Sequence, residues 1–277
     1  ARAIGLSAFV YGYPLIESMR TCRMQTGGAT LRAPIDTLHH IRQPSTDQDR
    51  DIVTPANDLL YTTAWINLHD GPRLLTVPAA ERHPGRYFVL ALYDAYTENF
   101  ANIGPRNSLA GGEEVLLIGP DAEVPEAYQK HRIVRSSTHL VWLIGRILVA
   151  DTADLPGAQA LQAEIHLSAV AGTIRGTRPL AVEQWDREPT DAMALAFEQG
   201  LPAAEVAPRF FTSLCHALVD APGRMEDRGM VNWLGQAGLM ANAHFQWNAL
   251  DATVQAGLIE GFAEAVQLVA VTARSRR

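Results

Sequence analysis

The stretch that decides the fold spans residues 55–120. It reads PANDLLYTTAWINL (55–68), GPRLLTVP (71–78), GRYFVLALYDAYTENFANIG (85–104) and EEVLLIGP (113–120). Gly, Pro and an Asn-Asp pair separate its short apolar runs, as is typical of strands in a sheet. We expect strands at 60–68, 73–77, 87–93, 115–118 and 140–149. The last run, LVWLIGRILV, is equally compatible with a buried helix.

The segment before this stretch has a helical pattern. Ile4, Ala8 and Tyr11 recur at near-helical spacing, and Pro14 interrupts the run. Proline removes a backbone donor, so we expect the helix to break there. An irregular, polar segment should follow up to about residue 50.

The segment after this stretch is helical and rich in alanine. Helical patterns cover 151–170, 206–221 and 250–277, and the last of them ends in basic residues that suit a helix C-terminus. Strands followed by helices predict an α+β fold, with a largely antiparallel sheet in the N-terminal and central region and a helical C-terminal layer. We expect an α+β domain over 1–170 and a helical segment over 171–277, packed together as one compact unit.

Composition excludes several classes of protein. The chain has 277 residues, of which 47% are hydrophobic and 19% charged, which is ordinary for a globular protein with a sizeable core. Its net charge of −7 disfavours nucleic acid as a partner, because that affinity comes largely from concentrated Lys and Arg. No run approaches the roughly 20 apolar residues that span a bilayer, so no membrane partner is expected.

Two cysteines, Cys22 and Cys215, do not make a disulfide framework. Free core cysteines in a reducing compartment are the economical interpretation. The N-terminus shows no signal peptide, since Gly12 and Pro14 interrupt its apolar run. We therefore expect a cytoplasmic protein.

Familiar catalytic and cofactor motifs are missing from the sequence. It contains no GxSxG elbow, GxxxxGK[ST] phosphate loop, GxGxxG fingerprint or HExxH pair. The adjacent histidines His39 and His40 would point in different directions on a regular element. We expect neither a metal site nor a cofactor.

Arg73 and Glu98 are the charged residues that stand out. Arg73 opens one expected strand, and Glu98 follows another in a polar patch that spans 94–99. A cation and a carboxylate at the ends of rigid elements could hold an anionic substrate while a base removes a proton. The alternative is a surface ion pair for Arg73 and a solvated loop carboxylate for Glu98.

Aromatic residues cluster around these charges in the sequence. They are Trp65, Tyr87, Phe88, Tyr96 and Phe100. They are candidates to line an apolar pocket for an aromatic substrate, in which a partly desolvated Glu98 would be a stronger base. The alternative is that they are core residues of the strands.

Several dispersed motifs, in order along the chain, resemble the family DUF1254. They are Asn57-Asp58 with Tyr61, Leu75-Thr76-Val77-Pro78, Gly85-Arg86-Tyr87, Asp94, Glu98-Asn99-Phe100-Ala101, Ile103-Gly104, Gly119-Pro120, Val141-Trp142, Ile144-Gly145-Arg146, Asp151 and Asp154. The resemblance covers about residues 8–167. It implies an α+β domain followed by helices.

The pair Arg73 and Glu98 is also similar to that of bacterial enzymes that form β-carbolines by a Pictet–Spengler reaction. The resemblance implies a natural-product enzyme that condenses a tryptophan-like aromatic amine with an aldehyde and needs no cofactor. Glu98 would deprotonate the ammonium group and later the cyclised carbon, and Arg73 would hold an anionic part of one substrate.

Two alternative functions stay open. One is a noncatalytic protein that binds a small ligand in the family's pocket, and the other is a hydrolase or isomerase that uses Glu98 with water. A homodimer is plausible from the resemblance and from the apolar face FAEAVQLVAV (262–271) of the last helix.

Overall fold

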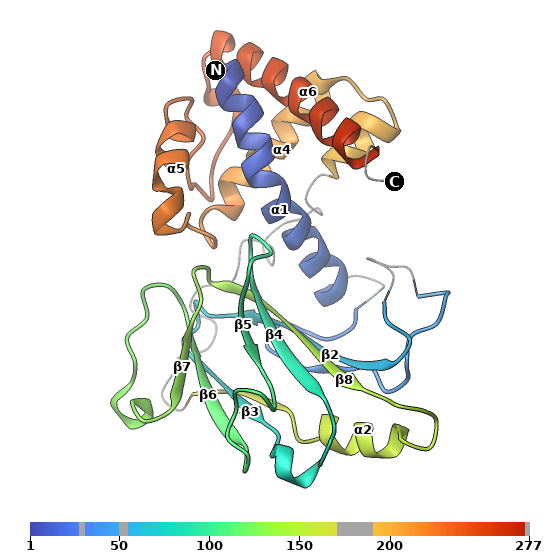
Figure 1. Ribbon diagram of the computed structural model, residues 1–277. Helices are drawn as coiled ribbons and strands as arrows, with labels where there is room; N and C mark the ends of the chain where they lie inside the picture. The colour runs from blue at the N-terminus through green and yellow to red at the C-terminus, as the bar shows by residue number, and fades with distance from the viewer. Residues whose placement is uncertain (28–30, 50–54, 171–190, 275–277) are drawn as a thin grey trace. The chain divides into compact units, whose positions relative to one another are not determined.

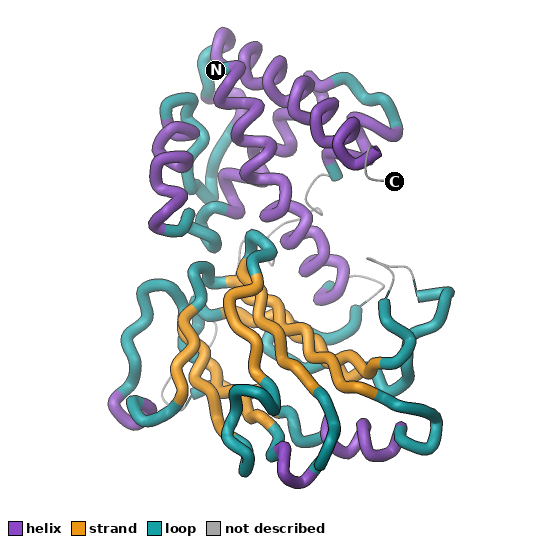
Figure 2. Tube along the Cα trace, in the orientation of Figure 1, coloured by secondary structure: helices purple, strands orange, loops and turns teal. Residues whose placement is uncertain are grey.

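A computed structural model describes residues 1–27, 31–49, 55–170 and 191–274 (Figure 1). The chain divides into two compact units. The helical unit comprises Ala1–Met24, Ala95–Thr97 and Leu180–Arg277, and the sheet unit comprises Gln25–Asp94 and Glu98–Pro179. In Figure 2 the strands belong to the sheet unit, whereas the long helices belong to the helical unit.

The sheet unit holds two sheets. The five-stranded sheet has the order β1-β2-β8-β4-β5 and is antiparallel throughout. The four-stranded sheet has the order β7-β6-β3-β9, and its β6–β7 pair is parallel. The strands are β1 His39–His40, β2 Leu59–Asn67, β3 Arg73–Val77, β4 Phe88–Asp94, β5 Asn99–Ile103, β6 Glu113–Ile118, β7 Arg132–Arg135, β8 Leu140–Leu148 and β9 His166–Ala169.

One apolar core joins the two sheets. Alternate residues of β2 and β4, such as Leu60 and Leu90, meet residues of β3 and β6, such as Leu75 and Val115, in a single buried cluster. Because side chains alternate between the faces of a strand, the other residues of β2, β8 and β4 lie on the opposite face of the five-stranded sheet. The helix α2, Leu155–Gln162, adds Ala158 and Leu161 to the core.

The opposite face, which we call the cavity face, carries three rows of paired residues across β2, β8 and β4. Their register is Trp65–Trp142–Tyr93, Thr63–Ile144–Ala91 and Tyr61–Arg146–Val89. Cross-strand partners lie side by side on the same face, so each row forms a contiguous strip. The rows run from aromatic rings at one end to Arg146 at the other.

The helical unit is built on long helices with an aromatic core. Its helices are α1 Arg2–Thr26, which extends two residues beyond the unit, α4 Ala203–Ala217, α5 Arg228–Gly235 and α6 Ala252–Arg274, with a π-helical turn at Ala194–Glu198. Phe9 of α1 packs on Phe210 of α4 and Phe262 of α6, with ring centroids 4.9 and 5.2 Å away. These contacts join three helices that are distant in sequence.

The predicted α+β class is confirmed, and the run at 140–149 is strand β8. The break at Pro14 is wrong, because α1 continues through it. Leu15, Ile16 and Met19 are fully buried, and this packing outweighs the missing backbone hydrogen bond. The helix predicted over 151–170 is also wrong in its second half, where β9 pairs with β3.

The division into units differs from the expected boundary at residue 170. The N-terminal helix groups with the C-terminal helices, and the sheet unit is inserted between them in sequence. Sequence patterns identify helices, but they carry no signal for which helices share a core. The segment that follows the expected boundary, residues 171–190, lies outside the described residues.

Both cysteines are buried and neither forms a disulfide, as predicted. Burial raises the pKa of the Cys215 thiol to about 12. In the described part of the chain, one helix segment, residues 252–272 of α6, is long and apolar enough to cross a membrane. A core helix of a water-soluble protein meets the same criterion, so the cytoplasmic location and the homodimer stay predictions.

His40 predicts how stability depends on pH. Burial, together with the neighbouring charges of Arg42, His39 and His166, lowers the pKa of His40 from 6.5 to about 4. Between pH 6.5 and about 4 the unfolded chain binds a proton that the folded chain does not, so the free energy of unfolding falls as the pH drops through this window. We expect His40→Gln to make that fall shallower by up to about one proton in the linkage slope.

Chemical denaturation at several pH values would measure this slope. Glutamine carries both a donor and an acceptor, so it can replace the hydrogen bond between the ring Nδ1 and Thr62 Oγ1 at 3.0 Å. His244→Gln, at an exposed position of the helical unit, is the matched control. An unchanged slope in His40→Gln would show that His40 is not the titrating group.

Candidate functional site

A cavity of about 450 Å³ lies on the cavity face of the five-stranded sheet. Its floor is made by Tyr61 and Thr63 of β2 and by Trp142, Ile144 and Arg146 of β8. These residues alternate along their strands with core residues, which is why they all project to one side. The remaining lining residues belong to the segment that precedes β2, and we call them the second wall of the cavity, the floor being the first. They are Arg32, Ile41, Gln43, Pro44, Ser45, Thr46, Asp49 and Pro55.

The floor has an aromatic end and a cationic end. Trp142 and Arg146 are four residues apart on β8, with Ile144 between them. At about 3.3 Å per residue the floor is about 13 Å long. The cavity therefore offers an apolar surface of small-molecule length with a guanidinium at one end.

The ring of Trp142 is held by its neighbours. It stacks on Trp65 with centroids 4.7 Å apart and an interplanar angle of 8°, and Tyr93 lies on its other side at 6.5 Å. Trp65 is fixed in turn, because its Nε1 donates to Gln25 Oε1 at 2.9 Å. The buried Trp142 Nε1 has no hydrogen-bond acceptor among the described residues.

The charged residues that line the cavity differ in their hydrogen bonds and ion pairs. The Asp49 carboxylate accepts hydrogen bonds from the Thr46 N–H at 2.7 Å and the Thr46 hydroxyl at 3.1 Å. These bonds hold the pKa of Asp49 below its usual value. Arg146 is half-buried, and among the residues that the structure describes its side chain has no ion pair or hydrogen bond.

Tyr61 adds a phenolic hydroxyl to the lining of the cavity. Its oxygen accepts a hydrogen bond from the Ala56 N–H at 3.0 Å. A phenol is both donor and acceptor, so the hydroxyl hydrogen is still able to donate. Tyr61 and Arg146 are cross-strand partners, and together they place two donors at one end of the floor.

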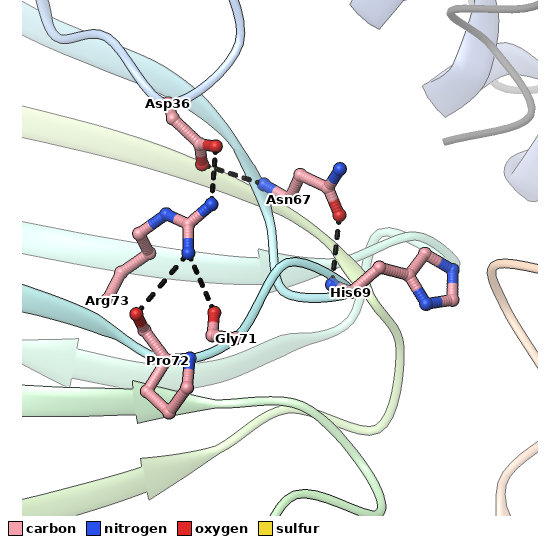
Figure 3. Close-up of polar contacts among 6 residues, drawn as sticks. All are labelled: Asp36, Asn67, His69, Gly71, Pro72 and Arg73. Atoms are coloured by element: carbon pink, nitrogen blue, oxygen red, sulfur yellow. Dashed lines mark hydrogen bonds and ion pairs between the residues drawn. The ribbon is translucent and has the colours of Figure 1, made fainter. Parts of the chain in front are cut away.

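Arg73 holds the segment that forms the second wall (Figure 3). Its side chain is 2% exposed, and its Nη2 contacts Asp36 Oδ2 at 2.6 Å. Its Nη1 donates to the carbonyl oxygens of Gly71 and Pro72 at 2.8 and 3.3 Å. Arg73 is therefore a buried structural cation, and its guanidinium is not presented to the cavity.

Asp36 also forms hydrogen bonds with strand β2. Its Oδ1 accepts a hydrogen bond from the Asn67 N–H at 2.9 Å, and its own N–H donates to the Trp65 carbonyl at 2.7 Å. Its φ of 63° is a left-handed conformation that Asp adopts more readily than most residues. The chain from Arg32 to Thr46 is thus fastened at Asp36 to the end of β2 and the start of β3.

Glu98 lies elsewhere in the sheet unit. It is exposed at the end of the turn between β4 and β5, and no hydrogen bond or ion pair joins it to Arg73 in the described part of the chain. The turn is held by Asp94, whose carboxylate accepts hydrogen bonds from the Glu98 N–H at 3.0 Å and the Ser137 hydroxyl at 2.7 Å. The structure does not bring the two predicted catalytic residues together.

The five predicted substrate-binding aromatics are also dispersed. Trp65 is 3% exposed beneath the stack with Trp142, and Phe88 is in the core between the sheets. Phe100 packs against that core, Tyr87 is exposed with the Arg106 guanidinium 5.7 Å from its ring, and Tyr96 belongs to the helical unit. Tyr96 donates its hydroxyl to the Ala221 carbonyl at 2.8 Å.

Two of the motif residues have a structural role that the fold explains. Arg86, before β4, forms a two-pronged ion pair with Asp154, which precedes α2. The Arg86 hydrogen bonds and that from the Ala150 N–H hold the pKa of Asp154 at about 2. This pair joins β4 to the loop after β8.

The cavity residues could have been found from one signal in the sequence. Positions 142, 144 and 146 hold Trp, Ile and Arg, whereas 141, 143, 145 and 147 hold only apolar residues or glycine. That difference is what a strand with one face in the core produces. The open choice between strand and helix for 140–149 concealed it.

The fold and the cavity define an α+β protein with a two-sheet unit and a small-molecule-sized cavity on one sheet. Residues 35–169 match the family described as "Protein of unknown function (DUF1254)". This match supports the resemblance at the level of the family. The family description assigns no activity.

Part of the chain is similar in sequence to curated proteins. It is 28% identical over 162 residues to a phenolphthiocerol/phthiocerol polyketide synthase component of Mycobacterium tuberculosis (strain ATCC 25618 / H37Rv), and equally to one of Mycobacterium bovis (strain ATCC BAA-935 / AF2122/97). The match covers 55% of this chain but spans only 9% of the length of each synthase component.

A solved structure shares the fold. The VPA0106 protein from Vibrio parahaemolyticus aligns with a TM-score of 0.71 at 16% identity, over 98% of this chain and 59% of that one. At this identity the likeness concerns the fold alone. None of these relatives supports the narrower resemblance to β-carboline-forming enzymes.

The role of Arg73 can be tested by denaturation. Arg73→Met leaves the Asp36 carboxylate and two carbonyls without their donor, so we expect a loss of about 3 kcal/mol in the free energy of unfolding. Arg82→Met is the matched control, because Arg82 is 64% exposed in its ion pair with Glu164 and should lose less than about 1 kcal/mol.

The double variant Arg73→Met/Asp36→Asn separates the ion pair from other effects of Arg73. Because both partners lose their charge, the combined loss should be smaller than the sum of the single losses by about 1 kcal/mol or more. Strict additivity would contradict the proposed anchor.

Proposed function

We propose that this chain binds a small organic molecule in the cavity on the five-stranded sheet. The observation that carries the proposal is a preformed floor on which a stacked tryptophan, an isoleucine and an arginine occupy successive positions of one strand face. Small-molecule sites are typically concave, mostly apolar and provided with a few polar anchors. This cavity combines those features on rigid strands.

The cavity has a suitable size. Its volume of about 450 Å³ lies within the range of roughly 300–1,000 Å³ that is usual for ligand sites. Strands position side chains more precisely than loops do, so the floor needs little rearrangement on binding. The ring of Trp142 is preorganised by Trp65, which lowers the entropic cost of contacting a flat ligand.

The condensation of a tryptophan-like amine with an aldehyde stays a prediction. The aromatic row Trp65–Trp142–Tyr93 is compatible with an indole ligand, but Arg73 is committed to Asp36 and Glu98 lies outside the lining of this cavity. An enzyme of this kind would need other residues to hold its substrate. Mass spectrometry with tryptophan and a panel of aldehydes tests it, since condensation gives the summed mass less one water.

Binding in the cavity can be tested with a neutral aromatic probe, 2-naphthamide, by isothermal titration calorimetry. We expect Trp142→Ala to weaken binding at least tenfold, because the ring supplies a large apolar contact of roughly 1.5 kcal/mol or more. Trp233→Ala in α5 is the matched control, since it removes the same side chain from the helical unit.

Thermal melting of both variants shows whether they are folded. Equal binding by wild type and by a folded Trp142→Ala variant would place the ligand elsewhere. No binding of the probe to wild type at millimolar concentration would contradict the proposed function.

A further inference from the structure

We propose that the molecule bound in this cavity is an organic acid whose carboxylate is held by Arg146 and whose flat apolar body lies toward Trp142. This inference rests on the proposed function and adds the chemical class of the ligand. It is carried by the environment of Arg146, by its distance from Trp142 and by the other charges of the cavity.

Arg146 lies on the central strand of the five-stranded sheet, and its described neighbours on the cavity face are uncharged. In the register its cross-strand partners are Tyr61 on β2 and Val89 on β4, and Ile144 and Leu148 are next to it on its own side of β8. None of these residues carries a negative charge. A guanidinium cannot lose its proton in a protein, so a half-buried one without an ion pair among the described residues is poised to bind an anion.

The other charged residues of the lining also favour an anionic ligand. Arg32 and Arg146 contribute two cations to the lining, and Asp49 contributes one carboxylate, which accepts two hydrogen bonds from Thr46 and also interacts with the charge of Arg32. The described lining thus carries a net positive charge in a chain whose overall net charge is −7. That local reversal attracts an anionic ligand in preference to a neutral one of the same shape.

The donors at this end of the floor suit a carboxylate. The planar guanidinium of Arg146 can form two parallel hydrogen bonds to the two oxygens of a carboxylate. The Tyr61 hydroxyl, which accepts from the Ala56 N–H, can donate its hydrogen to the same group. Together they can saturate one carboxylate.

The rest of the floor sets the size and character of the body. Between Arg146 and Trp142 the strand presents Ile144, flanked across the sheet by Thr63 and Ala91. These side chains are short or apolar, and Trp142 provides an aromatic ring four residues from Arg146, a backbone separation of about 13 Å. A bicyclic or extended apolar acid spans most of that length.

The test uses two probes of the same shape, 2-naphthoate and 2-naphthamide, titrated into the full chain by calorimetry. We expect wild type to bind the acid more tightly than the amide. Arg146→Gln should weaken binding of the acid at least about tenfold, the effect of losing a charge-assisted pair, and should change binding of the amide less than about threefold. Arg146→Lys should give an intermediate affinity for the acid, because it keeps the charge but loses the two-pronged geometry.

Arg106→Gln is the matched control. It makes the same exchange at an exposed arginine of the sheet unit that does not line the cavity, and binding of both probes should stay within about twofold of wild type. Amide binding by Arg146→Gln shows that the variant retains its cavity. If that variant is unfolded, Arg146→Lys provides the comparison.

The outcomes separate the two proposals. Equal affinity of wild type for acid and amide, with both dependent on Trp142 and neither on Arg146, would overturn the acid and leave the cavity as a binding site. A failure of both probes to bind wild type would overturn the proposed function itself. Weaker acid binding at higher salt, with amide binding unchanged, would further support the ion pair.

Discussion

The ion pair between the buried Arg73 and the partly buried Asp36 is the constraint on which the candidate site depends. It joins the start of β3 to a segment that carries half of the cavity lining, and Asp36 extends the connection to the end of β2 through the Asn67 N–H and the Trp65 carbonyl. A buried pair of this kind stabilises little against an apolar alternative, but it is expensive to break on one side. Its importance here is positional.

The cavity also depends on how the five-stranded sheet uses its two faces. The side chains of one face pack in the core against the four-stranded sheet. Core and non-core side chains therefore alternate along β2, β8 and β4, and the register of these strands is fixed. Slippage by one residue would move Arg146 into that core and Ile147 out of it. The core therefore enforces the order Trp142, Ile144, Arg146 along the floor, although none of these residues contributes to it.

Much of the fold could be read from the sequence, because the strand runs of 55–120 have turn residues at both ends and the C-terminal helices have helical spacing. The sequence does not show which residues that are distant along the chain contact each other. Arg73 looked like a substrate-binding cation because nothing in the sequence shows that Asp36, 37 residues earlier, neutralises it. Glu98 looked like a base because a polar turn and a catalytic loop have the same composition. The cavity residues needed the register of β8 with β2, which is a long-range property.

The most direct test of this account is a crystal structure of the chain with 2-naphthoate bound. We expect density for the carboxylate beside the Arg146 guanidinium and the Tyr61 hydroxyl, with the naphthalene rings over Ile144 toward Trp142 and the Arg73–Asp36 pair intact. Density for the probe beside Glu98, or a carboxylate on Arg73 with Asp36 displaced, would contradict the account. Such density would instead support a site at Arg73 or Glu98, the two residues that the sequence indicates.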